Sequence, residues 1–217
     1  VGAGLVYLCN PNNPTGVAHS ASSIKKFVKQ VQNTSPETAI LIDEAYIEFA
    51  NDPTVSTALP LALNFPNIMI TRTFSKVYAM AGLRIGYALG QTETLERMKR
   101  TARFGSVTVL SATAGLAALQ DSVRRSWEIE ENRKVREFTL NAFRQIGREA
   151  TNSQTNFVWA NVGQTSKSFR DACFELDVLV GRDFRPIGNH YSRISLGTMD
   201  EMRQAVQVFE TVLTENE

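Results

Sequence analysis

Residues 4–16 read GLVYLCNPNNPTG, an apolar run that ends in a loop of prolines, asparagines and a glycine. The run at residues 5–9 predicts a buried strand. The same pattern recurs in AILIDEAY, residues 39–46, and in NIMITRTFSK, residues 67–76. Apolar strands separated by crossover segments predict an α/β fold with a mostly parallel sheet. The polar ends of such strands meet at one edge, where ligands bind.

The rest of the chain extends this pattern. Apolar spacing predicts a fourth strand at residues 84–90 and helices at residues 20–32, 92–103, 111–120 and 123–146. Beyond Gly147 we expect strands at residues 156–160, 178–180 and 191–196, and helices at residues 166–176 and 199–213. This order predicts a large α/β domain over residues 1–122 and a smaller α+β domain over residues 123–217.

Composition excludes several classes of protein. Of 217 residues, 43% are apolar and 21% are charged, which excludes a disordered chain. Lys and Arg total 23 against 22 Asp and Glu, which argues against nucleic-acid binding by bulk charge. No apolar run approaches the roughly 20 residues that cross a bilayer. Cys9 and Cys173 form neither a disulfide framework nor a metal site, and fit a reducing compartment, so we expect a cytoplasmic protein.

Lys76 is the first candidate for chemistry. A lysine in a desolvated pocket has a lowered pKa and can form a Schiff base. Thr73 and Ser75 precede it and Arg84 follows it, and hydroxyls with a guanidinium can hold a phosphate. A solvated surface lysine is the structural alternative.

Asp43 is the second candidate, because an unpaired carboxylate at the end of an apolar strand is unfavourable. It needs a cationic partner, and a protonated pyridine nitrogen would serve; a helix N-cap is the alternative. Tyr46 can place its hydroxyl in the same crevice or pack at a domain edge. The amide of Asn13 can donate to a ligand oxygen or belong to an ordinary Asn-Pro turn.

These motifs occur in order, each after an apolar strand: NPNNPTG at residues 10–16, DEAYIEF at residues 43–49, RTFSK at residues 72–76 and AMAGLRIGY at residues 79–87. With them the chain resembles the fold-type I, class I/II aminotransferases, which use pyridoxal 5′-phosphate (PLP). Within that group it is most similar to the histidinol-phosphate aminotransferases. The resemblance covers essentially all of the chain.

The resemblance implies a role for each cofactor residue. Lys76 would hold PLP as a Schiff base and act as the general base. Asp43 would pair with the pyridinium nitrogen and keep the ring an electron sink. The phenolic oxygen of the ring would bind Asn13 and Tyr46. Three further residues would bind the phosphate of the cofactor: Thr73, Ser75 and Arg84.

The resemblance also implies a substrate site and a reaction. Arg193, in an otherwise apolar alternating strand, would bind the acidic group of the substrate, with Arg182 as a second anion contact; a structural ion pair is the alternative for Arg193. The reaction would move an amino group between glutamate and a keto acceptor, expected to be imidazole-acetol phosphate. A homodimer with small-molecule substrates is implied, and no metal, membrane or nucleic acid.

Three other interpretations stay open. An aromatic or broad-range aminotransferase, or a threonine-phosphate decarboxylase, would share the same cofactor residues. A non-catalytic segment could keep the motifs as relics. A nucleotide-binding α/β domain could use Lys76 and Arg84, although the sequence has no glycine-rich phosphate loop.

The chain also departs from the family pattern. The segments that related enzymes carry upstream of the NPNNPTG loop have no counterpart, and the chain opens at Val1 directly before an apolar run. We therefore expect the C-terminal part of a longer protein, which by itself binds PLP poorly.

Overall fold

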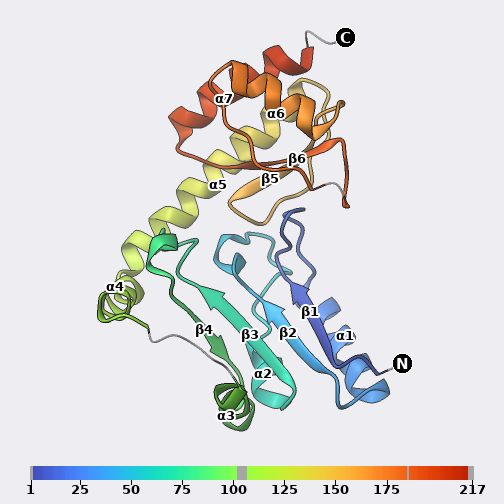
Figure 1. Ribbon diagram of the computed structural model, residues 1–217, viewed down its shortest axis with the longest axis vertical. Helices are drawn as coiled ribbons and strands as arrows, with labels where there is room; N and C mark the ends of the chain where they lie inside the picture. The colour runs from blue at the N-terminus through green and yellow to red at the C-terminus, as the bar shows by residue number, and fades with distance from the viewer. Residues whose placement is uncertain (1, 102–106, 185, 215–217) are drawn as a thin grey trace. The chain divides into compact units, whose positions relative to one another are not determined.

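The computed structural model describes residues 2–101, 107–184 and 186–214 (Figure 1). The chain forms two compact units. Unit 1 comprises Val1–Asn12 and Ala18–Glu128, and unit 2 comprises Asn13–Val17 and Ile129–Glu217. The division falls six residues after the boundary expected from the sequence, and the five-residue segment Asn13–Val17 belongs to unit 2. The expected domain assignment stays a prediction.

Unit 1 is built on a four-stranded sheet. Its strands are β1 (Leu5–Cys9), β2 (Ala39–Asp43), β3 (Ile68–Thr73) and β4 (Gly86–Leu89), in the spatial order β1-β2-β3-β4. The first three strands are parallel, and β4 is antiparallel to β3. The expectation of an α/β fold with a mostly parallel sheet is confirmed. The fourth strand begins at Gly86, two residues later than expected.

The helices of unit 1 follow the expected spacing with one exception. They are α1 (Ala21–Thr34), α2 (Leu59–Asn64), α3 (Thr92–Thr101), α4 (Val109–Gln120) and the first part of α5 (Ser122–Gln145). The hydroxyl of Ser20 accepts from the Ser23 amide and caps α1. Helix α2 was not expected, because its six residues make fewer than two turns and are too few to show a repeating apolar pattern. The expected end of α3, at residues 102–103, lies outside the described residues.

Alternation along the strands separates two faces of this sheet. Ile40, Ile42, Ile68 and Ile70 are buried on one face, where they pack against α1 and α2 in a single apolar cluster. We call this the covered face. The alternate residues, with Tyr7 and Asp43 among them, lie on the opposite face, which we call the open face. There Tyr7 is 59% exposed.

Unit 2 has its own core. Strands β5 (Phe157–Asn161) and β6 (Tyr191–Ser195) pair in antiparallel register, and the rest of α5, α6 (Ser166–Glu175) and α7 (Met199–Thr214) supply the helices (Figure 1). Phe143, Phe169 and Phe209 are buried in this core, where the Phe209 ring contacts the rings of the other two.

The strand expected at residues 178–180 is wrong. The Val178 amide donates to the Cys173 carbonyl at the end of α6, and Asp177 has a positive φ of 60°. Leu176 and Asp177 therefore form the turn that ends α6, and no described strand pairs with the residues 178–180 that follow it. Its alternating valines remain partly buried against the core, which explains why they resemble a strand.

None of the helices in the described ranges is long and apolar enough to span a membrane.

Candidate active site

Asp43 ends β2 on the open face and is the centre of a hydrogen-bonded cluster. Its Oδ2 accepts from the hydroxyl of Tyr7 at 2.5 Å, and its Oδ1 accepts from the Ala45 amide at 3.1 Å and from Thr71 Oγ1 at 3.3 Å. Tyr7 comes from β1 and Thr71 from β3, so three neighbouring strands hold this carboxylate. Partial burial and the bond to Asp43 raise the pKa of Tyr7, because both favour the neutral phenol.

Glu44, the next residue, points to the covered face and is 1% exposed. Its Oε2 accepts from Arg72 Nε and Nη2 at 3.1 and 2.8 Å and from Thr57 Oγ1 at 2.8 Å. Its Oε1 accepts from the Ala58 amide at 2.6 Å. Because Glu44 is buried, pairs with Arg72 and accepts four hydrogen bonds, its role is structural.

Lys76 lies in a tight loop after β3. Ser75 donates its amide to Thr73 Oγ1 at 3.0 Å, and Ala79 donates its amide to the Lys76 carbonyl at 2.8 Å. The Lys76 ammonium lies 5.4 Å from the ring centroid of Tyr46, which is buried beside the end of β2. The structure thus brings Lys76 and Tyr46 together, and both follow strands that end at the same edge as Asp43.

The backbone of this loop is strained. Among the described residues, three that are not glycine have positive φ, and two of them, Ala79 at 55° and Arg84 at 49°, fall within nine residues of Lys76. Such conformations cluster at functional sites because the surrounding structure must hold them. Arg84 is exposed and donates from Nη1 to the Ala81 carbonyl at 2.8 Å. No described contact joins it to Thr73, Ser75 or Lys76.

The remaining candidates belong to unit 2. Arg193, in β6, donates from Nη1 to Asn13 Oδ1 at 3.1 Å, although the two residues are 180 positions apart. The Arg193 guanidinium lies over the rings of Phe157 and Phe184, with its carbon 4.9 and 5.7 Å from the two centroids. Its Nε is buried and has no hydrogen-bond partner among the residues that the structure describes. Arg182 is exposed and lies 4.9 Å from the same Phe184 ring.

The NPNNPTG loop is held at both ends. Asn10 is buried; its side chain donates to the His19 carbonyl and accepts from the His19 amide, at 3.2 and 2.7 Å. Within unit 2, Gly16 has a positive φ of 71°, and a Cβ there would come within 2.6 Å of Ser153 Oγ. Only glycine fits this position, which explains the last residue of the motif. The Asn10-Pro11 and Asn13-Pro14 peptide bonds are both cis.

Two residues of this region were missed by sequence reasoning. Tyr7 was read only as part of a buried strand, yet the alternation that places Asp43 on the open face also places Tyr7 there. Glu44 was quoted only as part of a motif, and its partner Arg72 lies 28 residues away. Alternation could have found the first, whereas no local signal reveals the second. Within the described ranges, no group of three or more acidic, histidine or cysteine residues could hold a metal ion.

Comparison with known proteins agrees with this geometry. The family model for aminotransferase class I and II matches residues 1–209. A histidinol-phosphate aminotransferase of Symbiobacterium thermophilum is 34% identical over 99% of this chain and 58% of its own length. An aromatic amino acid aminotransferase of Mycobacteroides abscessus is 34% identical over 89% of this chain and 53% of its own length.

A solved structure is also similar. The histidinol-phosphate aminotransferase of Sinorhizobium meliloti, in complex with PLP, superposes with a TM-score of 0.85 at 27% identity, over 99% of this chain and 59% of that one. The chain thus spans little more than half the length of the relatives that it matches. Because the family model covers nearly all of its residues, the chain belongs to the aminotransferase class I and II family, whose members depend on PLP.

Proposed function

We propose that the protein is a PLP-dependent aminotransferase and that unit 1 carries its cofactor site. The observation that supports this most directly is the cluster on the open face. There Asp43 accepts from Tyr7, and the amine of Lys76 lies over the Tyr46 ring at the same edge of the sheet. A carboxylate and an amine at the ends of neighbouring parallel strands are the combination that this cofactor requires.

The residues present fit PLP. Oδ2 of Asp43 already accepts a hydrogen bond from a donor on the open face, the Tyr7 hydroxyl, so its geometry suits a protonated ring nitrogen. Lys76 supplies the primary amine that attaches the cofactor. Thr73 and Ser75 supply a hydroxyl and amide pair in one turn, and Arg84 supplies a guanidinium, all suited to a phosphate. Bound PLP would supply an electron sink for the substrate carbon that loses its proton.

Each of four side chains in unit 1 would have a separate role in the reaction. Nζ of Lys76 would act as the general base that takes and returns the proton at the substrate carbon. Asp43 would pair with the ring nitrogen and favour its protonated form, and Tyr7 would position that carboxylate through its hydroxyl. Tyr46 would hydrogen-bond the phenolic oxygen of the ring and help to orient it.

The substrate side is proposed for unit 2. The unpartnered Nε of Arg193 and its neighbouring Nη groups can take a carboxylate in two parallel hydrogen bonds. Asn13 is already bonded to this guanidinium, so it would orient Arg193 as well as bind the phenolic oxygen of the cofactor. Arg182 would add a second positive charge beside Phe184.

We infer that glutamate is the amino donor and imidazole-acetol phosphate the acceptor, in histidine biosynthesis. The relatives carry both histidinol-phosphate and aromatic names at 34% identity, so an aromatic or broad-range acceptor is the second candidate. A homodimer and a cytoplasmic location stay predictions.

The test is product analysis with the full-length protein. Supplied with PLP and glutamate, it is expected to release 2-oxoglutarate and then to aminate imidazole-acetol phosphate faster than phenylpyruvate. The opposite order of acceptors would favour the aromatic assignment. Lys76→Ala should abolish turnover, whereas Lys99→Ala, an exposed lysine of α3, should not. Release of CO₂ without amine transfer would contradict the proposal.

A further inference from the structure

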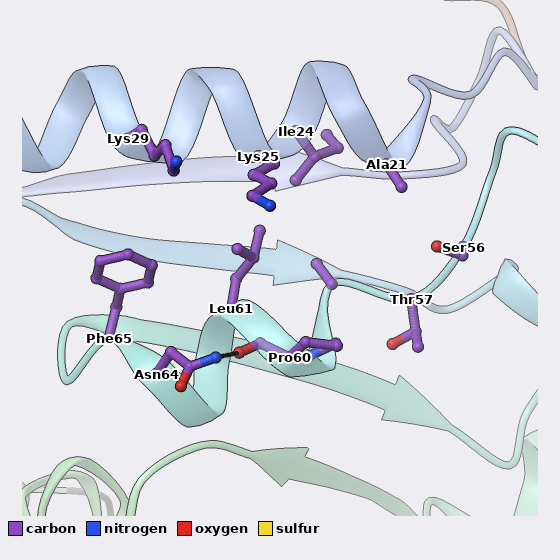
Figure 2. Close-up of a pocket in the computed structure, with 11 residues that line it drawn as sticks. Ala21, Ile24, Lys25, Lys29, Ser56, Thr57, Pro60, Leu61, Asn64 and Phe65 are labelled. Carbon is purple, nitrogen blue, oxygen red and sulfur yellow. Dashed lines mark hydrogen bonds between the residues drawn. The ribbon is translucent and has the colours of Figure 1, made fainter.

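Unit 1 has a pocket on its covered side that the proposed function does not use. It lies between α1 and the segment of residues 56–65, and its volume is about 390 Å³. Sites for small molecules typically fall between roughly 300 and 1,000 Å³. Figure 2 shows the pocket from the side, with α1 above and α2 below.

The pocket has an apolar body and a cationic rim. Ile24, Leu61 and Phe65 line its interior, while Lys25 and Lys29 extend from α1 toward α2 (Figure 2). None of the 11 lining residues is acidic. No acidic residue in the described part of the chain forms an ion pair with either lysine.

The two lysines are four positions apart, so they lie on one face of α1. Like charges at this spacing repel each other and destabilise a helix slightly. An anion held between the two ammonium groups would remove that repulsion. The charge of the pocket therefore selects for a negatively charged group, and its lining selects for an apolar body beneath that group.

The walls of the pocket are fixed by contacts outside it. Thr57 and Ala58, which line one wall, both donate to the buried carboxylate of Glu44. On the other wall, the Ala21 amide at the start of α1 donates to the Thr54 carbonyl at 2.9 Å. A pocket held in this way is preformed, and a ligand does not have to order its walls on binding.

We propose that this pocket binds a small organic anion whose carboxylate or phosphate lies between Lys25 and Lys29 and whose aromatic or branched apolar body contacts Ile24, Leu61 and Phe65. Neither Lys76 nor Asp43 lines this pocket, so the site is separate from the proposed cofactor site. The ligand is therefore an effector or a second bound metabolite rather than a reactant.

The test is calorimetric titration of the full-length protein, saturated with PLP, with 4-phenylbutyrate and with phenyl phosphate as probes. We expect at least one probe to bind with a submillimolar Kd, and the tighter one identifies the head group. The neutral analogue 4-phenylbutyramide should bind at least about fivefold more weakly, because two exposed ion pairs contribute that order of affinity.

Variants localise the binding. K25Q/K29Q should weaken the better probe about fivefold, and K26Q should change its Kd less than twofold. Lys26 is the matched control because it lies on the same helix and carries the same charge but does not line the pocket. Both variants should keep the amine-transfer activity.

Three results would overturn the proposal: no binding of either probe at millimolar concentration, equal binding of the amide, or equal weakening by K26Q. A pocket that a second copy of the chain covers would also overturn it. In that case K25Q/K29Q would shift the oligomeric state in analytical ultracentrifugation without any probe.

Discussion

Two adjacent carboxylates, Asp43 and Glu44, lie on opposite faces of the sheet in unit 1 and differ in burial and in hydrogen bonding. On the covered face, Glu44 is buried and accepts four hydrogen bonds from Arg72, Thr57 and Ala58. On the open face, Asp43 is only half-buried and its strongest contact is the exposed Tyr7. The alternation of a strand thus buries Glu44 on the covered face and leaves its neighbour Asp43 on the open face.

Among the substitutions that test this comparison, the largest expected effect is a loss of stability when Glu44 is replaced. Glu44→Gln leaves the Arg72 guanidinium with only the more distant Glu48, at 4.0 Å, as a charged partner, and it turns an amide NH₂ toward groups that are donors themselves. We expect the free energy of unfolding to fall by about 3 kcal/mol. Asp43→Asn keeps an oxygen for the Ala45 amide and should change it by less than about 1 kcal/mol.

Urea denaturation followed by circular dichroism measures both variants. Equal losses in the free energy of unfolding for the two variants would contradict the proposed difference between the two faces. A loss for Asp43→Asn alone would reverse it.

A second contrast uses apolar residues of the same sheet. Ile70 is fully buried on the covered face, whereas Leu5 is 57% exposed on the open face. Ile70→Ala should lower the free energy of unfolding by about 3 kcal/mol through lost burial and a cavity. Leu5→Ala should stay within about 0.5 kcal/mol. The same denaturation midpoints check this, and a large loss for Leu5→Ala would show that the open face is packed.

Most of this sheet could be predicted from the sequence because its signals are local. Continuous apolar runs fix β1 to β3, and the polar residues after them fix the edge where Asp43 and Lys76 lie. The false strand at residues 178–180 arose because alternating valines also suit the end of a helix packed on a core. Helix α2 was not predicted because packing against Ile40 and Ile68 stabilises it, whereas its own sequence shows no helical pattern.

The site was predicted only in part, for the same physical reason. Lys76 and Asp43 carry strong local motifs, but the contacts of Asn13 with Arg193 and of Asp43 with Tyr7 join residues 180 and 36 positions apart. Only the folded chain reveals such pairs. The NPNNPTG loop shows the limit most clearly, because Asn13 to Val17 group with unit 2 rather than with the strand that precedes them.

Tyr7 provides the smallest and most specific test of the open face. Burial and its bond to Asp43 raise the pKa of its phenol above the usual value of about 10. Because the folded state holds this proton more tightly than the unfolded state, the stabilisation is complete below about pH 10 and is lost as the pH rises further. Tyr7→Phe should lower the free energy of unfolding by less than about 1 kcal/mol at neutral pH.

Alkaline titration of tyrosine absorbance measures this directly. The latest phenol to ionise should disappear in Tyr7→Phe and should ionise earlier in Asp43→Asn. An unchanged titration in Asp43→Asn would contradict the proposed bond between the two side chains.

The central claim is that Lys76 attaches the cofactor, and reduction with borohydride tests it most directly. The protein is mixed with PLP, reduced and digested, and the modified lysines are located by peptide mass spectrometry. The account predicts that Lys76 is modified at lower PLP concentrations than the exposed Lys26, and that Asp43→Asn removes this preference. Modification of Lys76 no greater than that of Lys26 would contradict the account.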